Sequence, residues 1–215
     1  AYTSIDETVY NIDNVPVSAQ TIDSCLTILH DWADGLLLEP AEIDKERGVI
    51  HEEWRLRSSA SMRMFERNLP KLFPGSRYGE RYPIGLMSVI DGCKPETLRA
   101  YYRKWYRPDN QAIIVVGDVD VNHIESKIKE LFSGIKVPAN AAKIEPVEVA
   151  DNDTAIYVID KDKEQQYDIF NIFMKHPAIP NAMKGDMSYL MKGYMDNVVT
   201  SMLGARYAEI RSEER

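Results

Sequence analysis

Residues 42–59, EIDKERGVIHEEWRLRSS, are the stretch around which the rest of the chain is interpreted. With the residues that flank them, from Ala41 to Leu72, they predict one long helix, because apolar residues recur at helical spacing. At about 100° per residue, Glu46 and Glu53 fall near the middle of the apolar face. That face also contains Ile43, Val49, Ile50, Trp54, Leu56, Ala60 and Met64. The opposite side collects Lys45, Arg47, His51, Glu52, Arg55 and Ser58.

Glu46 and Glu53 are therefore expected to be buried, and burial of a carboxylate has a free-energy cost. A carboxylate in an apolar environment must be paired, hydrogen-bonded, protonated or bound to a metal. Two interpretations remain open at this point. In the first, both acids are paired with Arg or Lys from a neighbouring element. In the second, one acid ligates a metal while the other orients a partner ligand. The spacing alone does not decide between them.

The segment EIDKERGVIHEEW resembles the segment of the pitrilysin/insulinase family of zinc metallopeptidases that supplies the third zinc ligand. In these inverzincins an H-x-x-E-H helix precedes it, and a Glu on a second helix completes the site. The resemblance implies that Glu53 is the zinc ligand and that Glu46 is the carboxylate that orients a ligand. No H-x-x-E-H occurs in the 215 residues. We therefore expect an excerpt whose two His ligands and catalytic Glu lie upstream of Ala1, and which by itself is inactive and binds no zinc.

Two further segments carry the same resemblance, in the same order as in the family. Residues 1–11 predict a strand. Their first ten residues, AYTSIDETVY, resemble the edge strand that pairs with the substrate backbone, which implies a substrate-binding role for Ala1, Tyr2 and Thr3. Residues 106–118, YRPDNQAIIVVGD, resemble the family's last strand of a lobe and carry no catalysis. The apolar run from Ala112 predicts a central strand.

The rest of the pattern predicts helices at about 17–38, 94–106 and 120–132, and a polar linker at 138–153. Two strands, 155–160 and 167–174, and a long amphipathic helix with core methionines are expected beyond the linker. The predicted fold class is α+β, a mainly antiparallel sheet with long helices packed on it, as in mitochondrial-processing-peptidase-like metallohydrolases. Parts of two successive lobes are expected: 1–137 of the zinc-bearing lobe, and 154–215 of a second, non-catalytic lobe.

The composition excludes several other classes of function. A formal net charge of -8 argues against a nucleic-acid partner, and no apolar run approaches the roughly 20 residues that a bilayer span needs. Cys25 and Cys93 match neither a metal-binding spacing nor a disulfide framework, and His30 and His51 are expected to be structural.

Three functions are therefore compared. The resemblance implies part of a zinc endopeptidase, with one zinc, a peptide or small protein as substrate, a homologous second half or subunit that closes a chamber, and a periplasmic or exported location. The alternatives are a non-catalytic peptide-binding half or partner subunit of the same family, and an α+β scaffold whose carboxylates are salt-bridged. Arg or Lys side chains against Glu46 and Glu53 would favour the scaffold.

Overall fold

The computed structural model describes residues 1–145, 147–175 and 179–213, and its contacts divide the chain into two units, Ala1–Asp168 and Ile169–Arg215. The first unit contains β1 (Tyr2–Thr3), β2 (Thr8–Val9), α1 (Ala19–Asp34), α2 (Pro40–Arg57), α3 (Ala60–Leu72), α4 (Arg77–Glu80), α5 (Met87–Gly92), α6 (Pro95–Trp105), η1 (Pro108–Asn110) and α7 (Val121–Phe132). The second contains η2 (Asn181–Met183) and α8 (Met187–Glu213).

Local signals in the sequence set most of the helix ends. The Ser18 hydroxyl accepts a hydrogen bond from the Thr21 amide at the start of α1, and the Asp120 carboxylate accepts the Asn122 and His123 amides at the start of α7. Pro40 and Pro95 occupy the first turns of α2 and α6, where a missing N–H costs nothing. The predicted helices at 17–38, 94–106 and 120–132 are confirmed, with slightly narrower bounds.

The prediction of one long helix over 41–72 is wrong in one respect, because this segment forms two helices, α2 and α3. The chain leaves helical geometry at Ser58 and Ser59, and the Ser59 hydroxyl then caps α3 by accepting the Met62 amide at 3.3 Å. A serine side chain competes in this way with continuation of the helix. The break separates the helix that carries Glu46 and Glu53 from α3.

The expected mainly antiparallel sheet is not confirmed. Within the described residues the only sheet is the β1–β2 hairpin, with Tyr2 opposite Val9 and Thr3 opposite Thr8. The single strand predicted over residues 1–11 folds back on itself, because the Ser4 amide donates to the Glu7 carbonyl at 2.8 Å and closes a turn.

The other predicted strands, at 112–118, 155–160 and 167–174, are not assigned as strands. Their apolar side chains are largely exposed, as at Ile114 (82%), Ile159 (94%) and Phe170 (86%). A strand needs a hydrogen-bonded neighbour, and the described residues supply none to these segments.

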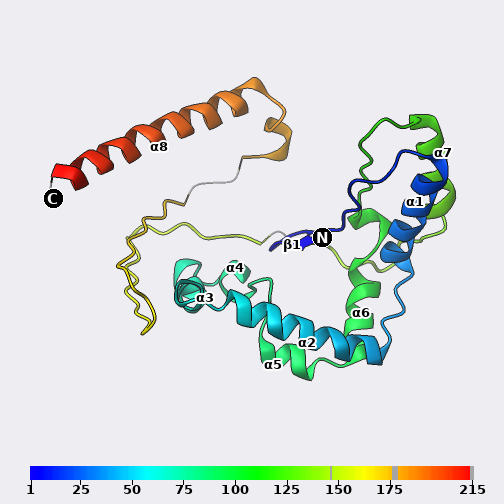
Figure 1. Cartoon of the computed structure of the whole chain (residues 1–215), viewed down its shortest axis with the longest axis horizontal. Helices are drawn as coiled ribbons and strands as arrows, with labels where there is room; N and C mark the ends of the chain where they lie inside the picture. The colour runs from blue at the N-terminus through cyan, green and yellow to red at the C-terminus, as the bar shows by residue number, and fades with distance from the viewer. Residues whose placement is uncertain (146, 176–178, 214–215) are drawn as a thin grey trace. The chain divides into compact units, whose positions relative to one another are not determined.

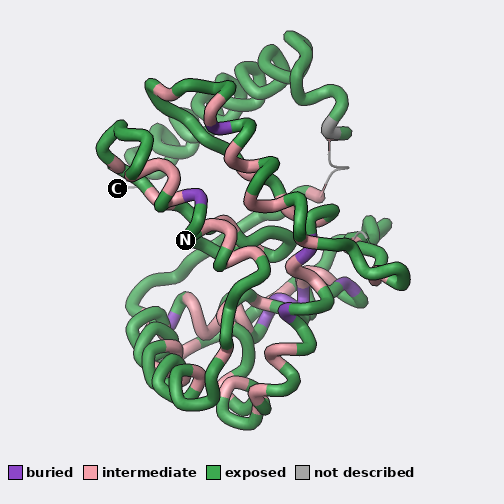
Figure 2. Tube along the Cα trace, turned by 90° about the vertical axis from the view of Figure 1, so that its right-hand side faces the viewer, coloured by how far each residue is buried: buried purple, intermediate pink, exposed green. Residues whose placement is uncertain are grey.

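Helix packing supplies the small core of the first unit. In Figure 1, α1 lies beside α7, α2 beside α5, and α3 beside α4, and these pairs are in contact. Figure 2 shows the buried positions as short, separated stretches of the trace. The buried apolar side chains are Leu26, Ala60, Leu69, Tyr102 and Ile124. Helix α8, in the second unit, has no buried residue among those described, so the expectation that its methionines fill a core is wrong.

One buried charge, Arg107, joins three segments of the first unit. Its side chain is 4% exposed, and all five of its N–H groups donate hydrogen bonds. Nε and Nη2 donate to the two Asp109 carboxylate oxygens at 2.9 and 3.0 Å, and Nη2 also donates to Asn110. Nη1 donates to the carbonyls of Lys104 and Ala142. The RPDN turn is thus a structural centre, in which one guanidinium fixes the end of α6 against residue 142.

A second group of ion pairs attaches residues 160–164 to α3. Arg63 donates two hydrogen bonds to Asp162, at 2.7 and 3.0 Å, and a third to Glu164. Arg67 and Asn68 both donate to the Asp160 carboxylate. These arginine hydrogen bonds lower the pKa of Asp162 to about 2. The contacts join residues that lie on either side of the predicted linker at 138–153.

Replacing Arg107 with Ala is expected to lower the free energy of unfolding by about 2–4 kcal/mol, because it leaves two carbonyls and a carboxylate without their donor. Urea denaturation followed by tryptophan fluorescence measures this in the first unit, which contains Trp32, Trp54 and Trp105. Arg81→Ala, at an exposed arginine, is the control and should change stability by less than about 0.5 kcal/mol. Equal effects of the two substitutions would contradict the role assigned to Arg107.

Asp162→Asn should destabilise the protein in a pH-dependent way. The folded pKa of Asp162, about 2, lies below its unfolded value of about 3.9, so its contribution is complete above pH 4 and is lost as the pH falls towards 2. The stability difference between wild type and variant, measured by urea denaturation from pH 6 to pH 2, should shrink over that window. Asp153→Asn, at an exposed aspartate, should show no such change.

Candidate metal-ligating site on helix α2

Helix α2 presents to its neighbours a different face from the one predicted. Arg47 has an 18% exposed side chain and donates to the Cys93 carbonyl, and His51 Nε2 lies 2.7 Å from the Asp91 carboxylate. Both residues had been assigned to the outward side. The helix turns this way because residues 91 and 93, at the end of α5, offer hydrogen-bond acceptors to these two side chains. Their polar partners decide the orientation of α2.

The expectation that Glu46 and Glu53 are buried is consequently wrong. Both are exposed, as are Val49 (58%) and Leu56 (75%) on the same side of the helix, and all residues of α2 are described without one being buried. This exposed stripe of α2 contains Glu42, Glu46, Val49, Glu53 and Leu56. It combines three carboxylates with two apolar side chains, and single exposed apolar side chains are common on protein surfaces.

The neighbours of the two carboxylates differ. Glu53 forms an ion pair at 2.7 Å with Arg57, which lies one turn further along α2. The side chain of Glu53 is 46% exposed and that of Arg57 is 66% exposed. Glu46 has no hydrogen bond or ion pair within the described part of the chain. An exposed pair of this i, i+4 kind contributes only about 0.3–0.5 kcal/mol. The scaffold interpretation therefore applies weakly to Glu53 and not to Glu46.

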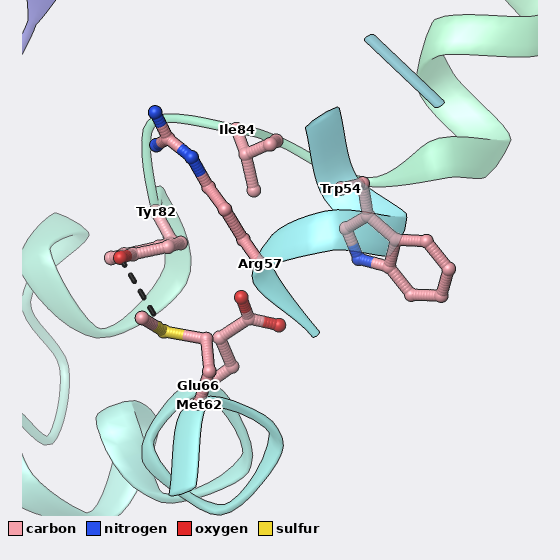
Figure 3. A pocket seen from close by; sticks show the side chains of 6 residues that line it. All are labelled: Trp54, Arg57, Met62, Glu66, Tyr82 and Ile84. Atoms are coloured by element: carbon pink, nitrogen blue, oxygen red, sulfur yellow. Dashed lines mark hydrogen bonds between the residues drawn. The ribbon is translucent and has the colours of Figure 1, made fainter. Parts of the chain in front are cut away.

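Arg57 also borders a small pocket that sequence reasoning missed (Figure 3). Its volume is about 10 Å³, room for one water molecule and no ligand. Glu66 of α3 lies at this pocket with its carboxylate facing the same space as Arg57. Partial burial raises the pKa of Glu66. A carboxylate on α3 gave no signal in the sequence, because only the break at Ser58 and Ser59 brings α3 back towards α2.

No metal site is complete among the described residues. Within 1–145, 147–175 and 179–213, no three His, Cys, Asp or Glu side chains are grouped closely enough to hold a metal ion. Zinc in a catalytic site takes three protein ligands, so Glu53 fits as one ligand and not as a site. His51 is hydrogen-bonded to Asp91, and the ring of His30 packs edge-on against Phe132. Both histidines therefore make structural contacts.

The predicted substrate-binding residues lie in the β1–β2 hairpin and are exposed. Tyr2 donates its hydroxyl to Glu7 at 2.8 Å, which raises the pKa of the phenol, and the Thr3 and Thr8 hydroxyls are 3.2 Å apart. In the part of the chain that is described, β1 pairs with β2 alone, so its second edge has no strand beside it. Among the described residues, no hydrogen bond or ion pair joins this hairpin to the exposed stripe of α2.

Comparison with known proteins defines the class. Residues 93–190 match the family described as the peptidase M16 inactive domain, a range that excludes Glu46, Glu53 and residues 1–3. The chain is homologous to members of the M16 family, the insulinase/pitrilysin-like zinc peptidases, and the resemblance found in the sequence is confirmed. Among the described residues, no helix is long and apolar enough to cross a bilayer.

The particular relatives are bacterial and plant proteases. The probable zinc protease PqqL of Escherichia coli is 36% identical over 182 residues, 83% of this chain and 19% of the relative, so the chain spans about a fifth of that protein. The crystal structure of the first half of the periplasmic protease PqqL from Escherichia coli is similar with a TM-score of 0.57 and 35% identity, over 63% of this chain and 29% of that one. The structure of a variant of the ferredoxin protease FusC in complex with Arabidopsis ferredoxin is similar with a TM-score of 0.56 and 26% sequence identity. The similarity covers 61% of this chain and 14% of that one.

The exposure of the two carboxylates leads to a stability prediction. Glu46→Gln and Glu53→Gln should each change the free energy of unfolding by less than about 0.5 kcal/mol, because neither removes a buried interaction. Arg47→Gln should cost more, since its guanidinium is largely buried against the Cys93 carbonyl. Urea denaturation of the three variants measures these changes in the free energy of unfolding. A decrease above about 1 kcal/mol for Glu53→Gln would show that this carboxylate stabilises the fold.

Proposed function

We propose that the chain is part of a zinc-dependent endopeptidase of the M16 family, in which Glu53 ligates the zinc and Glu46 orients a neighbouring ligand. The support is the homology to zinc proteases and the match of Glu46 and Glu53 to the family segment, because the exposure of both acids removes the argument from burial. When bound, zinc polarises the scissile carbonyl and lowers the pKa of its water to about 7. The remaining ligands are proposed to come from an H-x-x-E-H segment, which these residues do not contain.

The two acids are proposed to have different roles, and their spacing along the helix supports this. Seven residues rise about 10.5 Å along a helix axis, and zinc binds carboxylate oxygens at about 2.0–2.2 Å. Glu46 and Glu53 therefore project from the same side but from positions two turns apart. We propose that Glu53 exchanges its weak ion pair with Arg57 for the zinc ion, and that Glu46 accepts a hydrogen bond from another ligand.

Ala1, Tyr2 and Thr3 are proposed to hold the substrate backbone. The outer edge of β1 offers N–H and C=O groups to an extended peptide, which would add a strand to the hairpin. A peptide or small protein substrate accords with the neighbour solved with ferredoxin. A homologous second half, or a subunit that closes a chamber, accords with the solved first half of PqqL, and its description as periplasmic supports a periplasmic or exported location. The boundaries at 137 and 154 are proposed as those of two lobes.

A second candidate function is a non-catalytic, peptide-binding half of the same family. The observation in its favour is the match of residues 93–190 to the inactive domain. In that case Glu46 and Glu53 would hold no metal, and the hairpin edge would carry the only ligand contact. Zinc content separates the two candidates directly.

The test uses a longer form of the protein that includes an H-x-x-E-H segment ahead of β1. It should retain about one zinc per chain after dialysis, as the three-ligand site of a peptidase requires, and cleave peptides in a chelator-sensitive way. Glu53→Gln should abolish zinc retention, measured by elemental analysis. Glu52→Gln is the matched control, because Glu52 immediately precedes Glu53 in α2 and pairs with Arg55 at 2.9 Å.

Two results would count against the proposal. Full zinc occupancy in Glu53→Gln would remove Glu53 from the site. A longer form that binds peptides but retains no zinc would favour the non-catalytic half.

A further inference from the structure

A second concave region, away from the exposed stripe of α2, has the size of a small-molecule site. A cavity of about 360 Å³ lies between the loop after α1, helix α6 and the segment after α7. Ligand pockets in proteins commonly measure about 300–1,000 Å³ and combine apolar walls with a few polar groups. Leu36 and Leu37 line one side of this cavity, and Tyr102 and Tyr106 line another. The cavity therefore has room for a ligand and an apolar wall to receive it.

The charge of the lining is opposite to that of the chain. The cavity is bordered by Arg99, Arg103, Arg107 and Lys136 and by one acid, Asp34, in a chain whose formal net charge is -8. Arg107 is not available to a ligand, because its five donors are already used. The cations that remain still outnumber the single carboxylate.

Two of these cations have no partner among the residues that the structure describes. Arg103 and Lys136 make no hydrogen bond or ion pair within the described residues, whereas most other arginines of the first unit do. They come from different elements, α6 and the segment after α7, and border the same cavity. Both side chains are exposed at the cavity, so an anion bound there would meet a positive charge from each segment.

The backbone that forms one wall is held in an unfavourable conformation. Leu38 has φ 49°, in the left-handed region that a branched side chain rarely adopts. Helix α6 holds the loop there: Arg99 donates to the Leu38 carbonyl at 2.8 Å, and the Tyr102 hydroxyl donates to the Trp32 carbonyl at 2.8 Å while it accepts the Leu36 amide. Strained residues held in this way concentrate at ligand-binding positions. The wall is thus fixed before any ligand arrives.

We propose that this cavity binds a small organic anion, a molecule with a phosphate or carboxylate group and an apolar body. Arg103 and Lys136 bind the anionic group from two sides, and the rings of Tyr102 and Tyr106 with Leu36 and Leu37 contact the apolar body. Arg99 holds the loop and Arg107 holds the end of α6, so neither needs to contact the ligand. The site lies wholly within the first unit and does not depend on zinc or on Glu53.

The experiment titrates the 215-residue chain by isothermal calorimetry at low ionic strength with four probes: 1-naphthyl phosphate, 1-naphthoate, inorganic phosphate and 1-naphthol. At least one naphthyl anion should bind. Inorganic phosphate, which lacks the apolar body, and 1-naphthol, which lacks the charge, should each bind with a Kd about tenfold higher or more. Comparison of the naphthyl phosphate with the naphthoate identifies the anionic group. Added salt should weaken binding, as it does for exposed charges.

The substitutions assign the binding to the cavity. Arg103→Gln and Lys136→Gln should each raise the Kd of the naphthyl anion about tenfold, the loss of one charged hydrogen bond. Arg81→Gln and Lys163→Gln remove the same charges from exposed positions that do not line the cavity, and should leave the Kd unchanged. Far-UV circular dichroism checks that every variant keeps its helices.

Three outcomes would overturn the proposal. The first is that no probe binds the wild-type chain. The second is that the neutral naphthol binds as tightly as the anions. In the third, Arg103→Gln and Lys136→Gln weaken binding no more than the two controls do, which would mean that the anions are attracted only to scattered surface charge.

Discussion

The buried guanidinium of Arg107 is the interaction on which the packing of the first unit depends. A charge removed from water must find a partner for every donor, and Arg107 finds five, on Asp109, Asn110 and two backbone carbonyls. This requirement fixes the end of α6 against residue 142. Helix α6 in turn holds the loop after α1 through Arg99 and Tyr102. The positions of these three segments, and the cavity between them, follow from one satisfied charge.

Helix α2 shows how specific polar contacts can outweigh an apolar pattern. Ile43 and Ile50 are half-buried, but the contact face also includes Arg47 and His51, because Cys93 and Asp91 accept their hydrogen bonds. A helical wheel weighs residues by hydropathy and takes no account of acceptors on another element. The same rotation brings Glu46 and Glu53 to the surface, where they could meet a metal centre whose other ligands lie on another segment. The predicted burial of these acids was wrong, so their proposed role at a metal rests on the homology to zinc proteases.

The segments that favour strands illustrate a different limit. Residues 112–118 and 155–160 have the composition of buried strands, yet Ile114 and Ile159 are exposed and no strand forms there. Strand preference is realised only when a second segment supplies the complementary N–H and C=O groups. In the described residues that condition is met only by Tyr2, Thr3, Thr8 and Val9. The composition of these segments predicted strands, and without a hydrogen-bonded neighbour among the described residues they did not form a sheet.

The sequence by itself determined the local features of this protein and its family. Ser18, Asp120, Pro40 and Pro95 set helix ends because capping and the missing proline N–H act within one turn, and three ordered segments identified an M16 relative. Only the tertiary structure decided which face of α2 is exposed, that Glu66 and Arg57 border one small pocket, and that Arg103 and Lys136 border one cavity. Those outcomes depend on contacts between residues far apart in the chain, and neither periodicity nor spacing contains that information.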